Sequence, residues 1–219
     1  MAGMSTLDEP AERPGELVAD SVVHGIGLVA AIAGAGALMT AAVLHGAPLA
    51  TNGIYAAALI AMLTCSAAYN LGVRLSFREI LRRADHAAIF VMIAATYTPF
   101  TTGALHGAWA VGLTVTVWAV AAVGVALKVA LAPHGLRGVT TLLYIAFGWV
   151  GVVAAKPFLA ALSPTILALL VVGGLVYTAG TVFFALQRLP YQRAIWHGFV
   201  VAGAAIHFCA IFALVGLAG

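Results

Sequence analysis

Three pairs of polar residues, each with its members four positions apart, stand out in a strongly apolar chain. The pairs are Asp20 with His24, Ser66 with Asn70, and Arg193 with His197. Residues four apart on an α-helix share a face, so each pair would present its side chains together. Imidazoles and carboxylates donate lone pairs to metal ions, whereas arginine has none to give. The chemistry open to these pairs therefore depends on which of them meet.

The composition indicates an integral membrane protein. Of the 219 residues, 63% are apolar and 8% are charged, and the mean hydropathy is +1.09. A soluble protein carries about 25% charged residues. The apolar residues form runs of about 20, which is the length needed to cross a bilayer. Cys65 and Cys209 both lie inside such runs and indicate no disulfide framework.

The pattern of apolar runs predicts an all-α, seven-transmembrane helix bundle. We expect the spans at 20–45, 50–72, 85–104, 107–131, 138–157, 165–187 and 194–217. Residues 1–19 form a polar amino-terminal tail that we expect to be disordered, and 20–219 form the membrane domain. Small residues at 31–37 and 171–174 would let helix backbones approach closely.

The distribution of basic residues predicts the orientation. Nine of the ten Lys and Arg residues lie in the tail or in the second, fourth and sixth connections, and only Lys156 lies on the other side. The nine are Arg13, Arg74, Arg78, Arg82, Arg83, Lys128, Arg137, Arg188 and Arg193. The positive-inside rule then places the amino terminus in the cytoplasm and the carboxyl terminus outside. This segregation of charge is topological and argues against nucleic acid as a partner.

In this orientation the polar pairs converge at one depth. Odd-numbered spans begin at the cytoplasmic face and even-numbered spans end there. All three pairs should therefore lie at the same depth as Asp85 and His86, which open the third span. Asp85 is the last carboxylate in the chain. A charge at the centre of a membrane helix costs about 2.5–3.5 kcal/mol on insertion scales, so polar residues within spans mark function.

Each residue taken alone also has a structural interpretation. Arg193 could be a topology anchor at a helix start, and Asp85 a first-turn acid that complements the helix dipole. His24 and His197 could be hydrogen-bonded bundle histidines. His207 lies about 15 Å deeper than His197 at the helical rise per residue, and a lone buried histidine is often structural. Only the convergence of the group favours a functional polar cavity.

Several blocks in order resemble the hemolysin III family, the bacterial branch of the progestin and adipoQ receptors. They are "DSVVHGIG" at 20–27, "LRRADHAAIFVMIAATYTPF" at 81–100, "LYIAFGWVGV" at 143–152, "GGLVYTAGTVFF" at 173–184 and "AIWHGFVVAGAAIHF" at 194–208. The resemblance covers about residues 16–215. It implies seven spans with a cytoplasmic amino terminus.

The resemblance also implies a zinc site near the cytoplasmic face. In the family pattern a Ser-x3-His closes the second span, an Asp opens the third, and a His-x3-His opens the seventh. Ser66, Asp85 and His197 match, but Asn70 and Arg193 occupy the places of two of the three histidine ligands.

The amino-terminal Glu-x2-Asn-x3-His motif is altered as well. His24 remains, Asp20 replaces the Asn, and Leu17 replaces the Glu. A catalytic zinc needs three protein ligands, so we expect no zinc at the family position and no other cofactor.

Without a dication, Asp85 would need another positive charge. We hypothesise that Arg193 pairs with Asp85, while Ser66 and Asn70 donate neutral hydrogen bonds. Asp85 and Ser66 are then the candidate catalytic residues, and His24, Asn70, Arg193 and His207 complete the polar cavity.

Two functions follow from the resemblance. The first is a metal-free, multi-pass cell-membrane protein that senses or adjusts membrane lipid state, with membrane lipids as its partners. The alternative is a zinc-dependent lipid amidase or hydrolase, for which His24, His86 or a loop histidine would have to replace the lost ligands. A pore-forming cytolysin lacks a secreted amphipathic region, and one intramembrane carboxylate gives little support to an ion-linked transporter.

Overall fold

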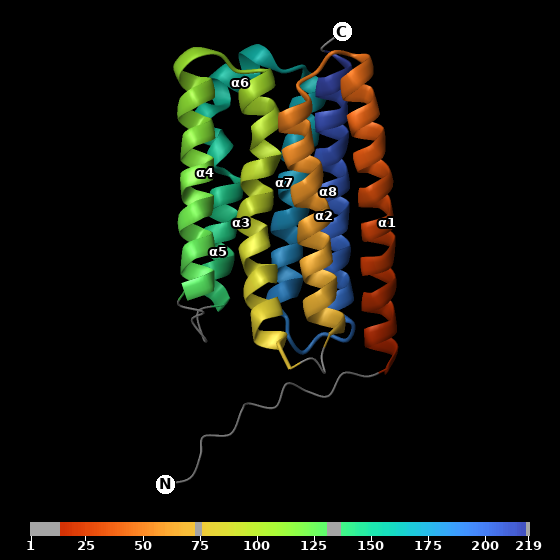
Figure 1. The fold of residues 1–219 in the computed structure, drawn as a ribbon. Coiled ribbons are helices and arrows are strands. Elements are labelled where there is room, and N and C mark those ends of the chain that lie inside the picture. Colours follow the sequence, from red (N-terminus) through yellow and green to blue (C-terminus); the bar gives the residue numbers. More distant parts are fainter. Residues whose placement is uncertain (1–13, 73–75, 131–136, 218–219) are drawn as a thin grey trace.

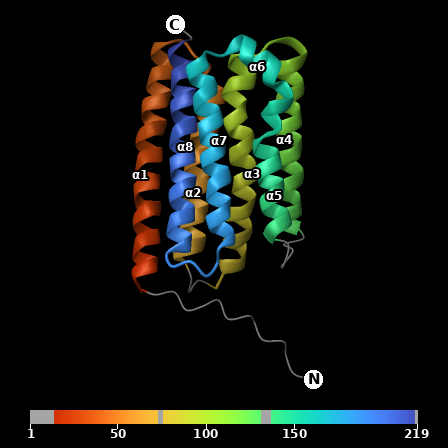
Figure 2. The same ribbon diagram turned by 180° about the vertical axis from the view of Figure 1, so that it is seen from behind.

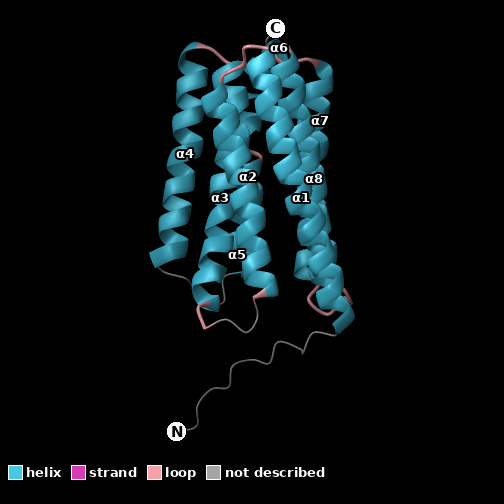
Figure 3. Cartoon of the chain, turned by 45° about the vertical axis from the view of Figure 1, so that its right-hand side comes forward, coloured by secondary structure: helices cyan, strands magenta, loops and turns pink. Residues whose placement is uncertain are grey.

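The computed structural model describes residues 14–72, 76–130 and 137–217 as a bundle of helices (Figure 1). The elements are α1 (Pro14–Leu44), α2 (Leu49–Leu71), α3 (Arg78–Gly103), α4 (Gly107–Ala130), α5 (Arg137–Gly148), the 3₁₀ helix η1 (Val150–Ala154), α6 (Ala155–Ala161), α7 (Pro164–Ala185) and α8 (Gln192–Gly216). Short loops join the helices, and no strand occurs among these residues (Figure 3). The all-α prediction is confirmed.

Several pairs of consecutive helices pack against each other, namely α1 with α2, α2 with α3, α3 with α4, and α7 with α8. The last helix closes the bundle, because α8 packs between α1 and α7 (Figure 2). Glycines allow the closest approaches, as expected for 31–37 and 171–174. A Cβ at Gly34 of α1 would lie 3.2 Å from the Phe208 ring of α8, and one at Gly173 of α7 would overlap the His207 ring. Close packing of this kind holds membrane helices together.

The predicted spans at 50–72, 107–131, 165–187 and 194–217 agree with α2, α4, α7 and α8 to within two residues at each end. The first and third helices begin earlier than predicted. α1 begins at Pro14, a residue whose fixed φ suits a first helical turn, and Glu16 follows it there. α3 begins at Arg78, ahead of its apolar part. Residues 1–13 of the expected tail lie outside the described ranges, so their disorder stays a prediction.

The outside of the bundle is apolar, as a membrane requires. Val29, Leu44 and Val153 are 69%, 77% and 74% exposed. Six helical segments in the described part of the chain are long and apolar enough to cross a bilayer, namely α1, α2, α4, Gly138–Ala161, α7 and α8. The length and composition of these helices therefore indicate a multi-pass membrane protein.

The remaining long helix, α3, differs in composition. Its 26 residues would reach about 39 Å, more than the ~30 Å hydrocarbon core. However, it carries a polar first turn and a threonine-rich second half. Thr96, Thr98 and Thr102 each donate a hydrogen bond to the α3 carbonyl four residues earlier, at 2.8, 2.8 and 2.7 Å. These hydroxyls are thereby satisfied within their own helix, which lies between α2 and α4.

The predicted span over 138–157 lies within the apolar helical segment Gly138–Ala161. It is not one continuous α-helix, because it is divided into α5, η1 and α6. Tyr97 of α3 stabilises the break. Its hydroxyl donates a hydrogen bond to the Gly148 carbonyl at 2.6 Å and accepts one from the Gly151 N–H at 2.8 Å. A Cβ at Gly151 would lie 2.9 Å from the Tyr97 ring, so glycine is needed for this approach. The tyrosine thus replaces hydrogen bonds that a continuous helix would have made.

Candidate functional site

The structure brings the predicted polar pairs together near the end of the bundle where α1 begins. Asp20 and His24 come from α1, Ser66 and Asn70 from α2, Asp85 from α3, and Arg193 and His197 from α8. Each member of a pair lies one helical turn from the other, as its spacing predicts. The predicted convergence at a single depth is therefore present in the fold.

Asp20 lies at the centre of this group. The residue is 3% exposed, and its Oδ1 is 2.6 Å from Nδ1 of His197. Nδ1 of His24 is 3.5 Å from the same oxygen and 2.9 Å from the Asp20 carbonyl oxygen. The two imidazole rings meet edge to face with their centroids 4.3 Å apart. A single buried carboxylate thus joins histidines from the first and last helices.

The opposite edge of the His24 ring, with Nε2, faces α2 and α3. Its Nε2 is 3.2 Å from Oγ of Ser66. The Asn70 amide nitrogen donates to the Ser66 carbonyl at 2.9 Å and approaches Oγ of Ser66 at 3.4 Å. The Ser66 hydroxyl in turn hydrogen-bonds the carboxylate of Asp85, which also interacts with the charge of His24. A polar chain therefore runs from α8 through α1 and α2 to α3.

Arg193 lies one turn before His197 and lines the same cavity as Asp85. Its charge acts on His197. The contacts just given for Asp85 involve Ser66 and His24. The pairing of Arg193 with Asp85 therefore stays a prediction.

The deeper histidine has a packing role. Nε2 of His207 is 3.2 Å from the Leu170 carbonyl oxygen of α7, and its ring rests on Gly173. It also lines the cavity, as predicted. His86, the other histidine weighed for the site, faces Tyr69 with 6.4 Å between ring centroids and lies apart from the Asp20 group.

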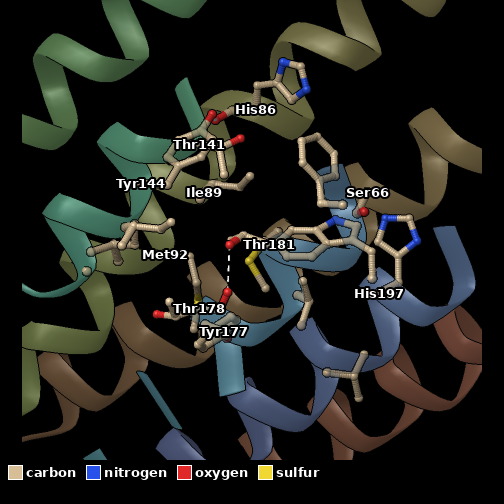
Figure 4. A pocket seen from close by; sticks show the side chains of 18 of the residues that line it. Ser66, His86, Ile89, Met92, Thr141, Tyr144, Tyr177, Thr178, Thr181 and His197 are labelled. Carbon is tan, nitrogen blue, oxygen red and sulfur yellow. Dashed lines mark hydrogen bonds between the residues drawn. The ribbon is translucent and has the colours of Figure 1, made fainter. Parts of the chain in front are cut away.

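A cavity of about 1990 Å³ opens beside the polar group. Small-molecule sites usually enclose about 300–1,000 Å³, so this space accommodates a larger ligand. Along α3 its lining runs from Arg78 to Phe100, which is about 33 Å at the helical rise. Ser66 and His197 lie on one side of it, and His86, Thr141 and Tyr144 on the other (Figure 4).

The two ends of the cavity differ in polarity. The deep end is lined by apolar side chains, which include Ile93, Phe100, Phe158, Leu167 and Val200. The mouth is lined by five basic and two acidic residues, which are Arg78, Arg82, Lys128, Arg188, Arg193, Glu16 and Glu79. The cavity therefore has the polarity of an amphipathic molecule with an anionic head.

One acid at the mouth is already neutralised. Glu79, in the polar first turn of α3 before its apolar part, accepts hydrogen bonds from Arg82 at 2.7 and 2.8 Å and from Arg83 at 3.0 Å. The hydrogen bonds from Arg82, and to a smaller extent the one from Arg83, hold the pKa of the Glu79 carboxyl at about 2. Glu79 thus stays ionised and paired, and adds little repulsion against an anion.

The zinc position that the family resemblance implies does not fit these residues. Position 193 carries a guanidinium without a lone pair, and the Asn70 amide is bonded to Ser66. A different set of donors does gather, because Asp20, His24 and His197 each offer a ligand atom within 4.8 Å of the others. All three are buried, and two of them, His24 and His197, line the cavity.

Sequence reasoning missed two features of this site. Asp20 was seen as a helix partner of His24, but its contact with His197, 177 positions away, was not predicted. The signal was present, since a carboxylate inside a span needs a partner. The cavity-lining aromatic residues Tyr97, Trp149 and Tyr177 were also missed. The sequence alone does not distinguish an aromatic residue facing a cavity from one facing lipid.

Comparisons with known proteins agree over most of the chain. The sequence model of a family described as Haemolysin-III related matches residues 17–208. The chain is 34% identical over 200 residues to a hemolysin-3 homolog of Bacillus subtilis, covering 90% of this chain and 93% of that protein. It is 32% identical to hemolysin-3 of Bacillus cereus, with 90% and 91% covered. A human monocyte to macrophage differentiation factor is 33% identical over 132 residues, which are 58% of this chain and 52% of that protein.

Proposed function

The chain belongs to the Haemolysin-III related family, and on that premise we propose that it binds a membrane lipid in its internal cavity and so senses or adjusts membrane lipid state. The observation that carries the proposal is the cavity of about 1990 Å³, with a basic mouth and an apolar deep end. An anionic head group would lie among the arginines, and an acyl chain would lie along α3. In this proposal Asn70 and Arg193 bind no metal ion.

We further propose that α3 is a seventh span and that the amino terminus is cytoplasmic. In support, the helix ends that carry Arg78, Arg82, Lys128 and Arg193, and the α7–α8 connection that carries Arg188, lie at the end of the bundle where α1 begins (Figure 1). The opposite end carries Lys156. The positive-inside rule favours the cytoplasm for the basic end. A carboxyl-terminal reporter that is active only in the cytoplasm should then be inactive, and an active reporter would contradict this topology.

The test of lipid binding is lipid analysis of the purified full-length protein by extraction and mass spectrometry. We expect about one amphipathic lipid per chain to survive exchange into fresh detergent. The change Ile93→Trp places an indole in the apolar end of the cavity, and a steric cost of about 1–3 kcal/mol corresponds to roughly 5- to 150-fold weaker retention.

The matched control is Ile32→Trp, because Ile32 is 55% exposed on the outside of α1. It introduces the same indole outside the cavity and should leave lipid retention unchanged. Both variants are checked for helix content by circular dichroism. Equal lipid retention by the two folded variants, or a wild-type protein that carries no lipid, would contradict the proposal.

A second candidate function, a metal-dependent lipid amidase or hydrolase, is favoured by one observation. The donors Asp20, His24 and His197 lie at the polar end of the cavity, where a lipid's carbonyl group would be placed. A metal ion there would supply Lewis-acid chemistry. The two candidates differ in turnover: a hydrolase releases free fatty acid from added amide or ester lipids, whereas a sensor leaves them intact.

A further inference from the structure

The group of Asp20, His24 and His197 contains an unusual arrangement of ring nitrogens. Nδ1 of His197 and Nδ1 of His24 both approach the same carboxylate oxygen of Asp20, at 2.6 and 3.5 Å. The residues Asp20, His24 and His197 are 3%, 4% and 8% exposed. Two imidazoles and one carboxylate converging in a buried place are the donor set of known zinc sites.

Oγ of Ser66 lies 3.2 Å from Nε2 of His24 and 3.4 Å from the Asn70 amide nitrogen. A ligating imidazole donates its other N–H to a nearby acceptor, and a hydroxyl oxygen can accept this bond. Ser66 is therefore placed to accept the Nε2–H of a metal-bound His24.

Nδ1 of His24 faces two oxygens of Asp20, the carbonyl at 2.9 Å and Oδ1 at 3.5 Å. A proton on Nδ1 satisfies this contact when no metal is bound. A metal ion that displaces this proton would be bound by the same nitrogen and by Oδ1 of Asp20.

We propose that Asp20, His24 and His197 bind one divalent metal ion of the zinc type, displaced from the zinc position that the family resemblance implies. Tetrahedral bonds of about 2.0–2.2 Å place neighbouring ligand atoms about 3.4 Å apart. The observed separations of 2.6 and 3.5 Å lie on either side of this value, and all three ligand atoms lie within 4.8 Å. Two of these ligands, His24 and His197, also line the cavity.

A neighbouring residue can orient one of these histidines for metal binding. A ligating imidazole donates its other N–H to a nearby acceptor, and this contact fixes its orientation. Ser66 is placed to be that acceptor for His24, since its Oγ lies 3.2 Å from Nε2. Neither Asn70 nor Arg193 is among the ligands of this site, although the charge of Arg193 acts on His197 and opposes a cation there. The inference goes beyond lipid binding and does not depend on it.

The experiment is zinc titration of the full-length protein after treatment with a chelator, by competition with a chromogenic chelator and by metal analysis. We expect one zinc per chain, retained through dialysis. Asp20→Asn and His24→Gln should each abolish stoichiometric binding. Ser66→Ala removes only the hydroxyl beside Nε2 of His24 and should weaken zinc binding about 10- to 100-fold.

The matched control is His207→Gln, which removes a buried histidine outside the group and should bind zinc as the wild type does. X-ray absorption of the zinc-loaded wild type supplies a readout that needs no variant. It should show two imidazole ligands and a carboxylate oxygen. A wild type that binds no zinc, binding that survives Asp20→Asn, or a spectrum with a single imidazole would each overturn the proposal.

Discussion

The Tyr97 bridge makes a quantitative prediction about stability. Tyr97→Phe removes one hydroxyl, and with it the hydrogen bond donated to the Gly148 carbonyl at 2.6 Å and the one accepted from the Gly151 N–H at 2.8 Å. Both backbone groups belong to the break between α5 and η1.

The magnitude follows from the number of bonds. Hydrogen bonds between membrane helices contribute about 0.6 kcal/mol on average and about 1.7 kcal/mol at most. Two such bonds predict a loss of about 1 to 3 kcal/mol in the free energy of unfolding. We expect Tyr97→Phe to show this loss in reversible unfolding in mixed micelles, followed by circular dichroism.

Tyr55→Phe is the matched control, since it makes the same chemical change at another buried tyrosine. Tyr55 of α2 is 0% exposed, and its hydroxyl has no hydrogen-bond partner among the described residues. Removing it should be neutral or slightly stabilising. If the two variants unfold with the same free energy, the bridge does not hold the broken helix and the reasoning is refuted.

Two further predictions concern charge and packing. Asp85→Asn should lower the free energy of unfolding by about 3–5 kcal/mol if Arg193 pairs with it, and unchanged thermal unfolding would contradict the pairing. Gly173→Ala drives a methyl group into the His207 ring and should cost about 1–3 kcal/mol, measured in the same unfolding assay. Gly36→Ala, whose new methyl group meets open space, should be neutral or stabilising, and equal effects of the two changes would refute the packing argument.

Much of the fold could be predicted from the sequence, because in a membrane the apolar run is itself the element. The ends of α2, α4, α7 and α8 fall where hydropathy changes. The break after Gly148 could not be predicted, because it depends on a hydroxyl 51 positions away on α3. Hydropathy does not predict the early start of α3 either, because ion pairs of Glu79 with Arg82 and Arg83 stabilise a polar first turn.

The candidate site was predicted as a set of residues but not as a set of contacts. Helical spacing and the alternation of span direction placed Asp20, His24, Ser66, Asp85 and His197 at one depth. Neither rule fixes the rotation of one helix about its axis relative to another, and that rotation brings Asp20 onto His197. The rotation follows from close packing, such as Gly27 of α1 against Val201 of α8, which a single sequence does not specify.

The threonine-rich composition of α3 bears on how the chain enters the membrane. As the proposed seventh span, α3 is less apolar than the six other segments, and partitioning into lipid favours Leu, Ile, Phe and Val. Its neighbours in space, α2 and α4, are also the helices synthesised just before and just after it. During biogenesis α3 is therefore expected to leave the translocon together with α2 and α4, so that membrane insertion of this middle region is cooperative and not helix by helix.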